Sequence, residues 1–357
     1  MEKLLAVKPD AFEAAERMRS WWNDEPTDRV VASVVAPRSE STQAQLRGNT
    51  RERLIHADTI IHNLRTTAGT RFWGGEALPT YWIFPITMPM SVYLGCEPVF
   101  KKNTAWQFPI FDAWDGENWH TLQFDSENEW WRKICDLTRR LIDEPNLPWL
   151  LSACGLGGIA DVMANLWGSE TLLLAMIDDP KGVRSLRNRL IDDFRIMYDQ
   201  LYGIVSNRQE GYFDWLNLWA PGTMCTSQSD ISCMMSSAMF EEFFVEEIRQ
   251  EANHVDYYFY HLDGPGAIRH LDALLDIDAL DGIQWVPGAG ASQDPMDWID
   301  LFVRIQNRGK KLLISCPPER VGPLLRSVQR RGLFLSIQCK SEAAAHRTLL
   351  NLDRLGC

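Results

Sequence analysis

His261 and Asp263 are two side chains whose types and spacing suit one shared metal ion. They close the stretch YYFYHLD, Tyr257–Asp263, in which four aromatic residues predict a buried strand and the polar pair marks its end. Side chains two residues apart in a strand point to the same side of the pleat, so the imidazole and the carboxylate face the same space. Zinc accepts nitrogen, oxygen and sulfur ligands. The spacing therefore favours a metal site at a strand end.

A cysteine thiolate would complete a set of three protein ligands. Cys339 and Cys316 each directly follow a predicted strand, so either is a candidate third ligand at the same rim. Three protein ligands with one open position are typical of a catalytic zinc. The interpretation without metal also stays open. In that case His261 is a hydrogen-bonded rim residue, Asp263 caps the helix near 266–275, and the cysteines fill the core.

Apolar runs alternate with helical segments along most of the chain. The predicted strands are Arg29–Pro37, Tyr81–Ile86, Leu147–Ser152, Tyr212–Trp219, Asp256–His261, Gly282–Val286, Lys311–Ser315 and Leu333–Gln338, and the predicted helices include Pro9–Asn23, Ser237–Asn253 and Asp297–Arg308. Apolar strands that alternate with helices predict a parallel sheet covered on both faces. About eight such units over this length indicate an α/β fold, specifically a (β/α)8 TIM barrel.

The chain has no glycine- or serine-rich hinge, no low-complexity tract and no sequence repeat. We therefore predict a single domain over residues 1–357, with a helical and irregular N-terminal extension at 1–80 and the main part of the barrel at 81–357.

The composition narrows the classes of partner. A net charge of −12 with scattered basic residues disfavours nucleic acid and anionic membranes, which leaves a small molecule or a protein. No window reaches the roughly eighteen apolar residues of a membrane span. The acidic N-terminal segment is unlike a signal peptide, so we expect a cytoplasmic protein with reduced thiols. The motifs of serine hydrolases, P-loop NTPases and zincins are absent from the sequence.

The strand ends hold further candidates, because active sites of such barrels lie there. Gln284, near the end of a predicted strand, is a candidate catalytic residue. Trp82, Trp106 and Trp285, together with Trp73, are candidate walls of a pocket for an aromatic or methylammonium group. Packing in the core or at the rim is the alternative for these rings.

The motif CGLGGIAD, Cys154–Asp161, follows a predicted strand and opens a helix. Gly155, Gly157 and Ala160 fit a variant of the dinucleotide-binding fingerprint, with the acidic pair 178–179 near the expected distance. A tight turn that needs small residues explains the motif as well.

Two segments carry a family resemblance. Thr226–Gln250 and Tyr260–Gly290 resemble the uroporphyrinogen decarboxylase superfamily, including its cobalamin-linked methyltransferase branch. The resemblance extends from about residue 81 onward and implies a barrel. In the methyltransferase branch a His-x-Cys pair and a distant cysteine hold zinc. His261 and Cys339 match that pattern, whereas Asp263 stands where the first cysteine would be.

The resemblance implies a function. The paired arginines with which the decarboxylase branch binds tetrapyrrole carboxylates are not reproduced at 29–53, so the predicted activity is zinc-dependent methyl transfer between a small methylated substrate and a corrinoid or cobalamin. The corrinoid would be free or held by a partner protein. Asp230, in the family's QSD position, is expected to orient the substrate. A decarboxylase or lyase and a non-catalytic binding barrel are the alternatives, and a homodimer is left open.

Overall fold

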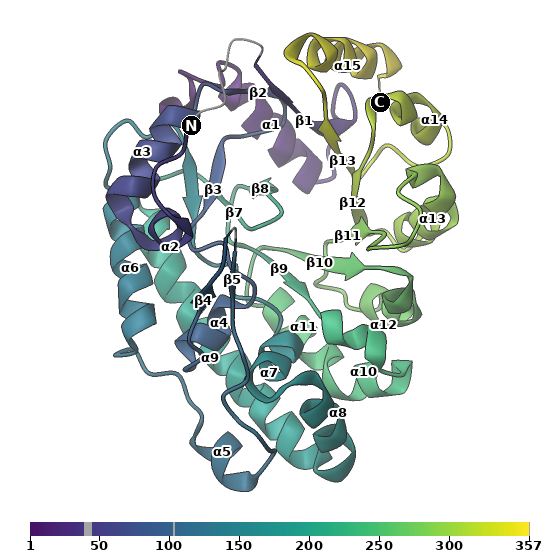
Figure 1. Cartoon of the computed structure of the whole chain (residues 1–357). Coiled ribbons are helices and arrows are strands. Elements are labelled where there is room, and N and C mark those ends of the chain that lie inside the picture. The colour runs from purple at the N-terminus through teal and green to yellow at the C-terminus, as the bar shows by residue number, and fades with distance from the viewer. Residues whose placement is uncertain (39–44, 103, 357) are drawn as a thin grey trace.

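The computed structural model describes residues 1–38, 45–102 and 104–356 as a mixed α/β chain (Figure 1). Its strands are β1 (Val31–Pro37), β2 (Arg71–Gly75), β3 (Thr80–Trp82), β4 (Val99–Phe100), β5 (Ala105–Trp106), β6 (Leu150–Ser152), β7 (Tyr212–Phe213), β8 (Trp219–Ala220), β9 (Met224–Gln228), β10 (Tyr257–Asp263), β11 (Gly282–Val286), β12 (Lys311–Ser315) and β13 (Leu333–Gln338).

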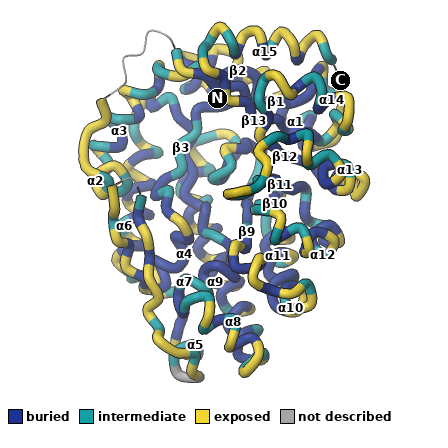
Figure 2. The backbone as a smooth tube through the Cα atoms, turned by 45° about the vertical axis from the view of Figure 1, so that its right-hand side comes forward, coloured by how far each residue is buried: buried dark blue, intermediate teal, exposed yellow. Residues whose placement is uncertain are grey.

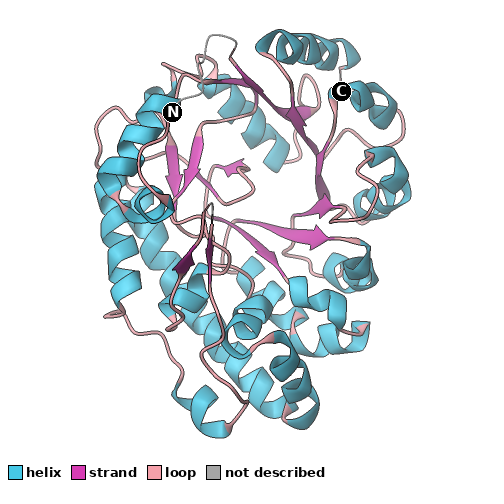
Figure 3. Ribbon diagram, in the orientation of Figure 1, coloured by secondary structure: helices cyan, strands magenta, loops and turns pink. Residues whose placement is uncertain are grey.

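The helices lie mostly outside the strands (Figure 3). They are α1 (Ala11–Trp22), α2 (Thr50–Ile55), α3 (Ala57–Thr67), α4 (Pro89–Tyr93), α5 (Gly116–Thr121), α6 (Glu129–Ile142), α7 (Ile159–Trp167), α8 (Ser169–Asp178), α9 (Pro180–Ser206), α10 (Ser237–Phe243), α11 (Val245–Ala252), α12 (Leu271–Leu275), α13 (Ile299–Asn307), α14 (Val321–Leu325) and α15 (Glu342–Leu355). Short 3-10 helices are η1 (Glu2–Leu4), η2 (Asp230–Met234), η3 (Pro265–His270), η4 (Pro295–Trp298) and η5 (Pro318–Arg320).

One mostly parallel sheet organises the chain. Its seven strands follow the order β2-β1-β13-β12-β11-β10-β9, and β2 alone runs antiparallel to its neighbour. The predicted α/β class with parallel strands is therefore confirmed. Among the described residues β3 and β6 form a separate parallel pair that no ladder joins to the larger sheet. A closed ring of strands thus stays a prediction.

The late strands follow the sequence pattern closely, whereas the middle of the chain does not. β11, β12 and β13 have the predicted bounds. The single strand predicted at Tyr212–Trp219 is wrong, because β7 and β8 form an antiparallel hairpin there. Asn217 takes a left-handed φ of 57° in its turn, which breaks the strand. β9 was missed because its residues Thr226 to Gln228 are polar although the strand is largely buried.

The N-terminal segment contributes to the sheet itself. β1 and β2 both lie within 1–80, so the boundary at residue 80 does not separate an extension from the sheet. The carboxylate of Glu76, directly after β2, is buried and accepts hydrogen bonds from Arg29, Arg17 and the backbone N–H of Ala32. Charge-assisted bonds of this kind are the stronger ones, so they hold β2 firmly against β1.

Helix α1 packs against the starts of the sheet strands on their inner face. The Trp21 and Trp22 rings lie 6.2 and 5.7 Å from the Phe259 ring, and Val31, Leu313 and Phe334 join the same buried cluster. This end of the interior is thus filled with apolar side chains, which leaves the carboxyl ends of the strands for polar groups.

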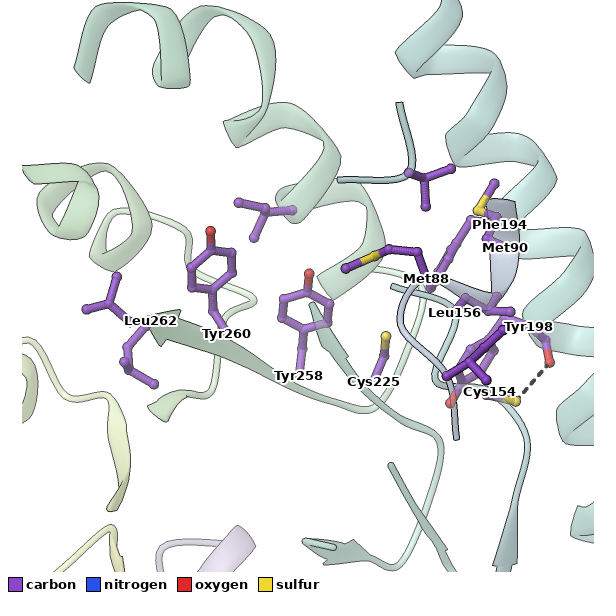
Figure 4. Close-up of a cluster of buried hydrophobic side chains, with 14 of the residues drawn as sticks. Met88, Met90, Cys154, Leu156, Phe194, Tyr198, Cys225, Tyr258, Tyr260 and Leu262 are labelled. Atoms are coloured by element: carbon purple, nitrogen blue, oxygen red, sulfur yellow. Dashed lines mark hydrogen bonds between the residues drawn. The ribbon is translucent and has the colours of Figure 1, made fainter. Parts of the chain in front are cut away.

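The opposite face of β10 packs against helices. Figure 4 shows Tyr258 and Tyr260 on one side of the strand, in a cluster with Cys225 and Met88. Two glutamates of α11 are fully buried behind this face. The hydroxyl of Tyr258 donates a 2.7 Å hydrogen bond to Glu251.

These buried carboxyls titrate abnormally. Burial raises the pKa of Glu251 to about 7. Burial, with the nearby charge of Glu251, raises the pKa of Glu247 well above its usual value. Figure 2 shows this buried interior in dark blue beneath exposed outer helix faces. No described helix is both long and apolar enough to cross a membrane.

Glu251→Gln should change how stability depends on pH. The native carboxyl holds its proton up to about pH 7, whereas the unfolded one releases it near 4.5. Native protein therefore binds more protons in this window, so stability falls as pH rises through it. The glutamine still accepts the Tyr258 hydrogen bond but does not titrate. Between pH 5 and pH 8 the free energy of unfolding of the wild type should therefore fall by roughly 3 kcal/mol relative to that of the variant.

Urea unfolding at the two pH values measures this fall. The matched control is Glu241→Gln, a change at an exposed residue of α10. An equal difference between Glu251→Gln and wild type at both pH values would contradict the assignment of a raised pKa.

Candidate functional site

A row of three polar residues crosses the sheet near the carboxyl ends of its strands. His261 of β10 lies in register with Gln228 of β9 and Gln284 of β11. The His261 Nδ1 is 2.5 Å from the Gln284 Oε1. An amide oxygen only accepts, so Nδ1 carries the donated hydrogen and Nε2 keeps its lone pair in the neutral ring. No hydrogen bond of the described residues occupies this Nε2.

The β7–β8 loop fixes the other side of the imidazole. The Trp215 ring meets His261 edge-on, with 5.0 Å between ring centroids, and its indole N–H donates to the Thr226 carbonyl at 3.3 Å. The buried Asp214 carboxylate accepts from the Thr226 backbone N–H. Burial raises the pKa of Asp214 to about 8. The loop, and hence the ring of Trp215, is tied to β9.

One carboxyl, that of Asp230, interacts electrostatically with His261, and a second, that of Asp263, interacts with Asp230. Asp263 is exposed at the end of β10, and Asp230 begins η2. Burial raises the pKa of Asp230, which the charge of His261 lowers and that of Asp263 raises. The structure therefore brings together four predicted site residues: Asp230, His261, Asp263 and Gln284.

A residue that sequence reasoning missed positions Asp230. The buried Asp161 carboxylate accepts from the backbone N–H of Asp230 at 2.8 Å and of Ile231 at 3.0 Å. Burial, with repulsion from Asp230, raises the pKa of Asp161 to about 7. Asp161 lies in the motif CGLGGIAD, and its acidic side chain in the first turn of α7 was the available signal.

Two cavities adjoin this row. The central cavity, of about 320 Å3, is lined from β1, β2, β11, β12 and β13 and includes Gln284, Trp285 and Trp73. The Trp82 cavity, of about 220 Å3, is lined by Trp82, Trp215 and other residues including Gln228. His261 thus contacts one residue of each cavity, Gln284 and Trp215.

The predicted tryptophans divide between these places. Trp285 is buried in the central cavity and packs on Trp298 at 4.9 Å between ring centroids. Trp82 lines the second cavity. Trp106 of β5 is 52% exposed and lines neither of the two.

The cysteines lie apart from His261. The Cys339 Sγ is buried 3.6 Å from the Thr348 hydroxyl of α15, and the Cys316 Sγ lies 3.4 Å from the Pro317 carbonyl. Burial raises the pKa of Cys316 to about 12, which disfavours a thiolate. Within the described part of the chain, no three His, Cys, Asp or Glu side chains are grouped as metal ligands. The donor set His261, Asp263 and Cys339 therefore does not fit a preformed zinc site.

The glycine motif has a structural explanation. A Cβ at Gly158 would lie 1.9 Å from the Gln228 carbonyl oxygen, and one at Gly155 would lie 2.8 Å from the Trp82 ring. Asp179 accepts from the Gly182 N–H and caps α9. The small residues allow the β6–α7 loop to approach the end of β9, as the tight-turn interpretation of the motif requires.

Comparison with known proteins gives a likeness in structure. No family model matches the sequence, and no curated protein matches it. A solved methyltransferase from Methanosarcina mazei superposes with a TM-score of 0.60 at 10% identity, over 96% of this chain and 98% of that one. At this identity the likeness concerns the fold, and it supports a mixed α/β architecture shared over nearly the whole length of both chains.

Gly158→Ala should destabilise the protein and loosen the row around His261. The new Cβ meets the backbone oxygen of Gln228, which has no flexible end that could move aside. Overpacking of this kind costs roughly 3 kcal/mol. Urea unfolding measures the loss.

Gly203→Ala is the matched control. Gly203 lies inside α9, and apart from its chain neighbours and the backbone of its own helical turns, no described atom lies within 4 Å of the position that an added methyl group would take. Alanine should therefore stabilise the helix by about 0.5–1 kcal/mol. Equal stability of Gly158→Ala and wild type would show that the β6–α7 loop is not held against β9 in this way.

Proposed function

We propose that the protein is a methyltransferase that moves a methyl group between a small methylated substrate, such as a methyl ether or a methylamine, and a corrinoid or cobalamin. The likeness to the Methanosarcina mazei methyltransferase over nearly all of both chains carries the proposal. The resemblance of two segments to the uroporphyrinogen decarboxylase superfamily supports it. A closed (β/α)8 barrel belongs to the same proposal, since the parallel strands and outer helices fit one.

His261 is the proposed proton donor and acceptor. When the substrate loses its methyl group, its heteroatom keeps the electron pair of the broken bond and needs a proton. The Nε2 of a protonated His261 would donate it, while Gln284 accepts from Nδ1 and holds the ring in place. In the reverse direction the same nitrogen removes that proton.

The surrounding groups serve this role. The Asp230 carboxyl lies close enough to His261 for the two groups to interact electrostatically. Asp161 holds the η2 backbone so that Asp230 stays at the site. Trp215 limits rotation of the imidazole.

Zinc stays a prediction and enters no step of this mechanism. A zinc ion bound by His261 and Asp263 would act as a Lewis acid on the substrate heteroatom. The side chain of Cys339 would have to leave Thr348 and turn inward to join these two ligands.

His261→Ala should lower the rate of methyl transfer by about 10²–10⁴-fold, the usual contribution of a general acid or base. The assay mixes the purified protein with reduced cobalamin and a panel of methyl ethers and methylamines, and follows methylcobalamin by its absorbance. His346→Ala, at a histidine with a 60% exposed side chain, is the control and should keep the wild-type rate. Failure of the wild-type protein to methylate cobalamin from any compound would count against the proposal.

Cys339→Ser should leave the metal content of the purified protein at its wild-type level, because Sγ faces Thr348. Elemental analysis after dialysis against zinc measures this, with His261→Ala analysed alongside. A fall in bound zinc to the same level in both variants would show instead that Cys339 turns inward and completes the predicted ligand set.

A further inference from the structure

The central cavity carries an unusual distribution of charge. Arg71 is the only residue with a formal charge among its described lining residues. The rest are apolar, aromatic, hydroxyl or amide side chains such as Ser336, Gln338 and Asn217. This lining belongs to a chain with 48 acidic and 36 basic residues, so the absence of any carboxylate from the described lining is a property of the cavity and not of the composition.

Arg71 has no partner of opposite charge in the part of the chain that the structure describes. No hydrogen bond or ion pair of the described residues involves its guanidinium, whereas Glu76, five residues on, is held by two other arginines. Arg71 is exposed and begins β2 opposite Pro37, at the carboxyl end of β1. Among the described residues the guanidinium thus has no hydrogen-bond acceptor, and it lies at the end of the sheet where the polar row lies.

Another cavity adjoins the central cavity at this arginine. It has a volume of about 560 Å3, lies beside α2 and α3, and shares Arg71 and Trp149 with the central cavity. Arg53 is its other charged residue among those described, and again no described carboxylate lines it. The Arg53 Nε donates to the Arg47 carbonyl, which does not neutralise its charge. Arg71 and Arg53 thus give these two cavities positive charge, and no described lining residue of either carries a negative charge.

The other side of the central cavity lies near acidic groups instead of arginines. Gln284 accepts a hydrogen bond from His261, and the carboxyl of Asp230 interacts with that imidazole and with the carboxyl of Asp263. An anionic group is repelled there and attracted to Arg71. A ligand with one negative end is consequently oriented, with its charge at Arg71 and its other end toward Gln284 and His261.

We propose that the substrate of this site carries a carboxylate and that Arg71 binds it. The planar guanidinium donates two parallel hydrogen bonds to a carboxylate, which fixes direction as well as charge. A single cation, and the lack of any helix residue in the described central lining, suit a monoanion better than a phosphate dianion. Trp73, Trp149 and Trp285 line the space between and favour a flat aromatic body.

This proposal rests on the proposed function in one respect only, the identity of the transferred group. That group is a methyl group at the end of the substrate remote from the carboxylate. A methoxy-substituted aromatic acid has the required parts. Binding is measurable without any corrinoid, so the two proposals can fail separately.

Isothermal titration with para-methoxybenzoate and its neutral analogue para-methoxybenzamide tests the inference. Wild-type protein should bind the carboxylate about tenfold to a hundredfold more tightly than the amide, the usual contribution of hydrogen bonds to a charged group. Arg71→Gln should remove this preference and leave the affinity for the amide unchanged. Arg71→Lys should retain part of it, because the charge remains without the bidentate geometry.

Arg347→Gln, at an exposed arginine of α15, is the matched control and should bind like wild type. Equal affinities for the two compounds in wild type, no binding of the carboxylate at millimolar concentration, or an Arg71→Gln variant that keeps the preference would each overturn the inference. Arg71-dependent binding without methyl transfer would support the carboxylate site and count against the methyltransferase. Methyl transfer from neutral compounds at a rate that Arg71→Gln does not change would support the methyltransferase and count against the carboxylate site.

Discussion

The alternation of side chains along β10 is the constraint on which the candidate site depends. Successive residues of a strand point to opposite faces. Tyr258 and Tyr260 lie on the side of the helices (Figure 4), so His261 and Asp263 point to the other face of the sheet. A slip by one residue would carry the two tyrosine rings to the inner face and place the imidazole in the outer core. The hydrogen bond from Tyr258 to Glu251 opposes such a slip, because the slip would leave the buried Glu251 carboxyl without its donor. The buried side of the strand therefore positions the polar side.

The same rule of alternation explains how much the sequence could predict. His261 and Asp263 could be assigned to one face of a strand end, because the aromatic run and its polar break both lie within seven residues. The parallel α/β class followed from the apolar strands of the second half. The place of Cys339 could not be read from its likeness to a family position. Its Sγ packs on Thr348 of α15, because Cys339 continues the face of β13 that meets this helix.

Other parts of the site come from contacts between residues far apart in the sequence. Asp161 bonds the backbone 69 and 70 residues away, and nothing in the motif around it indicates that partner. Trp215 reaches His261 only because the predicted strand at 212–219 is instead a hairpin, with Asn217 in its turn. Arg71 lies in the segment that the sequence pattern assigned to an extension. Its place at the cavity depends on β2 pairing with β1, which the Glu76 ion pairs secure.

Burial separates the acidic groups of this chain into two kinds with different consequences. Glu247 and Glu251 lie behind the sheet, where burial favours their neutral forms and they act as hydrogen-bonding core residues. Asp230 lies between that interior and the site, since its backbone is held by the buried Asp161 while its carboxyl interacts with His261. A proton gained or lost at Asp161 therefore changes the charge beneath η2, and with it the electrostatic field at Asp230. The fold thus links the protonation of its interior to His261, which contacts Gln284 of the central cavity and Trp215 of the Trp82 cavity.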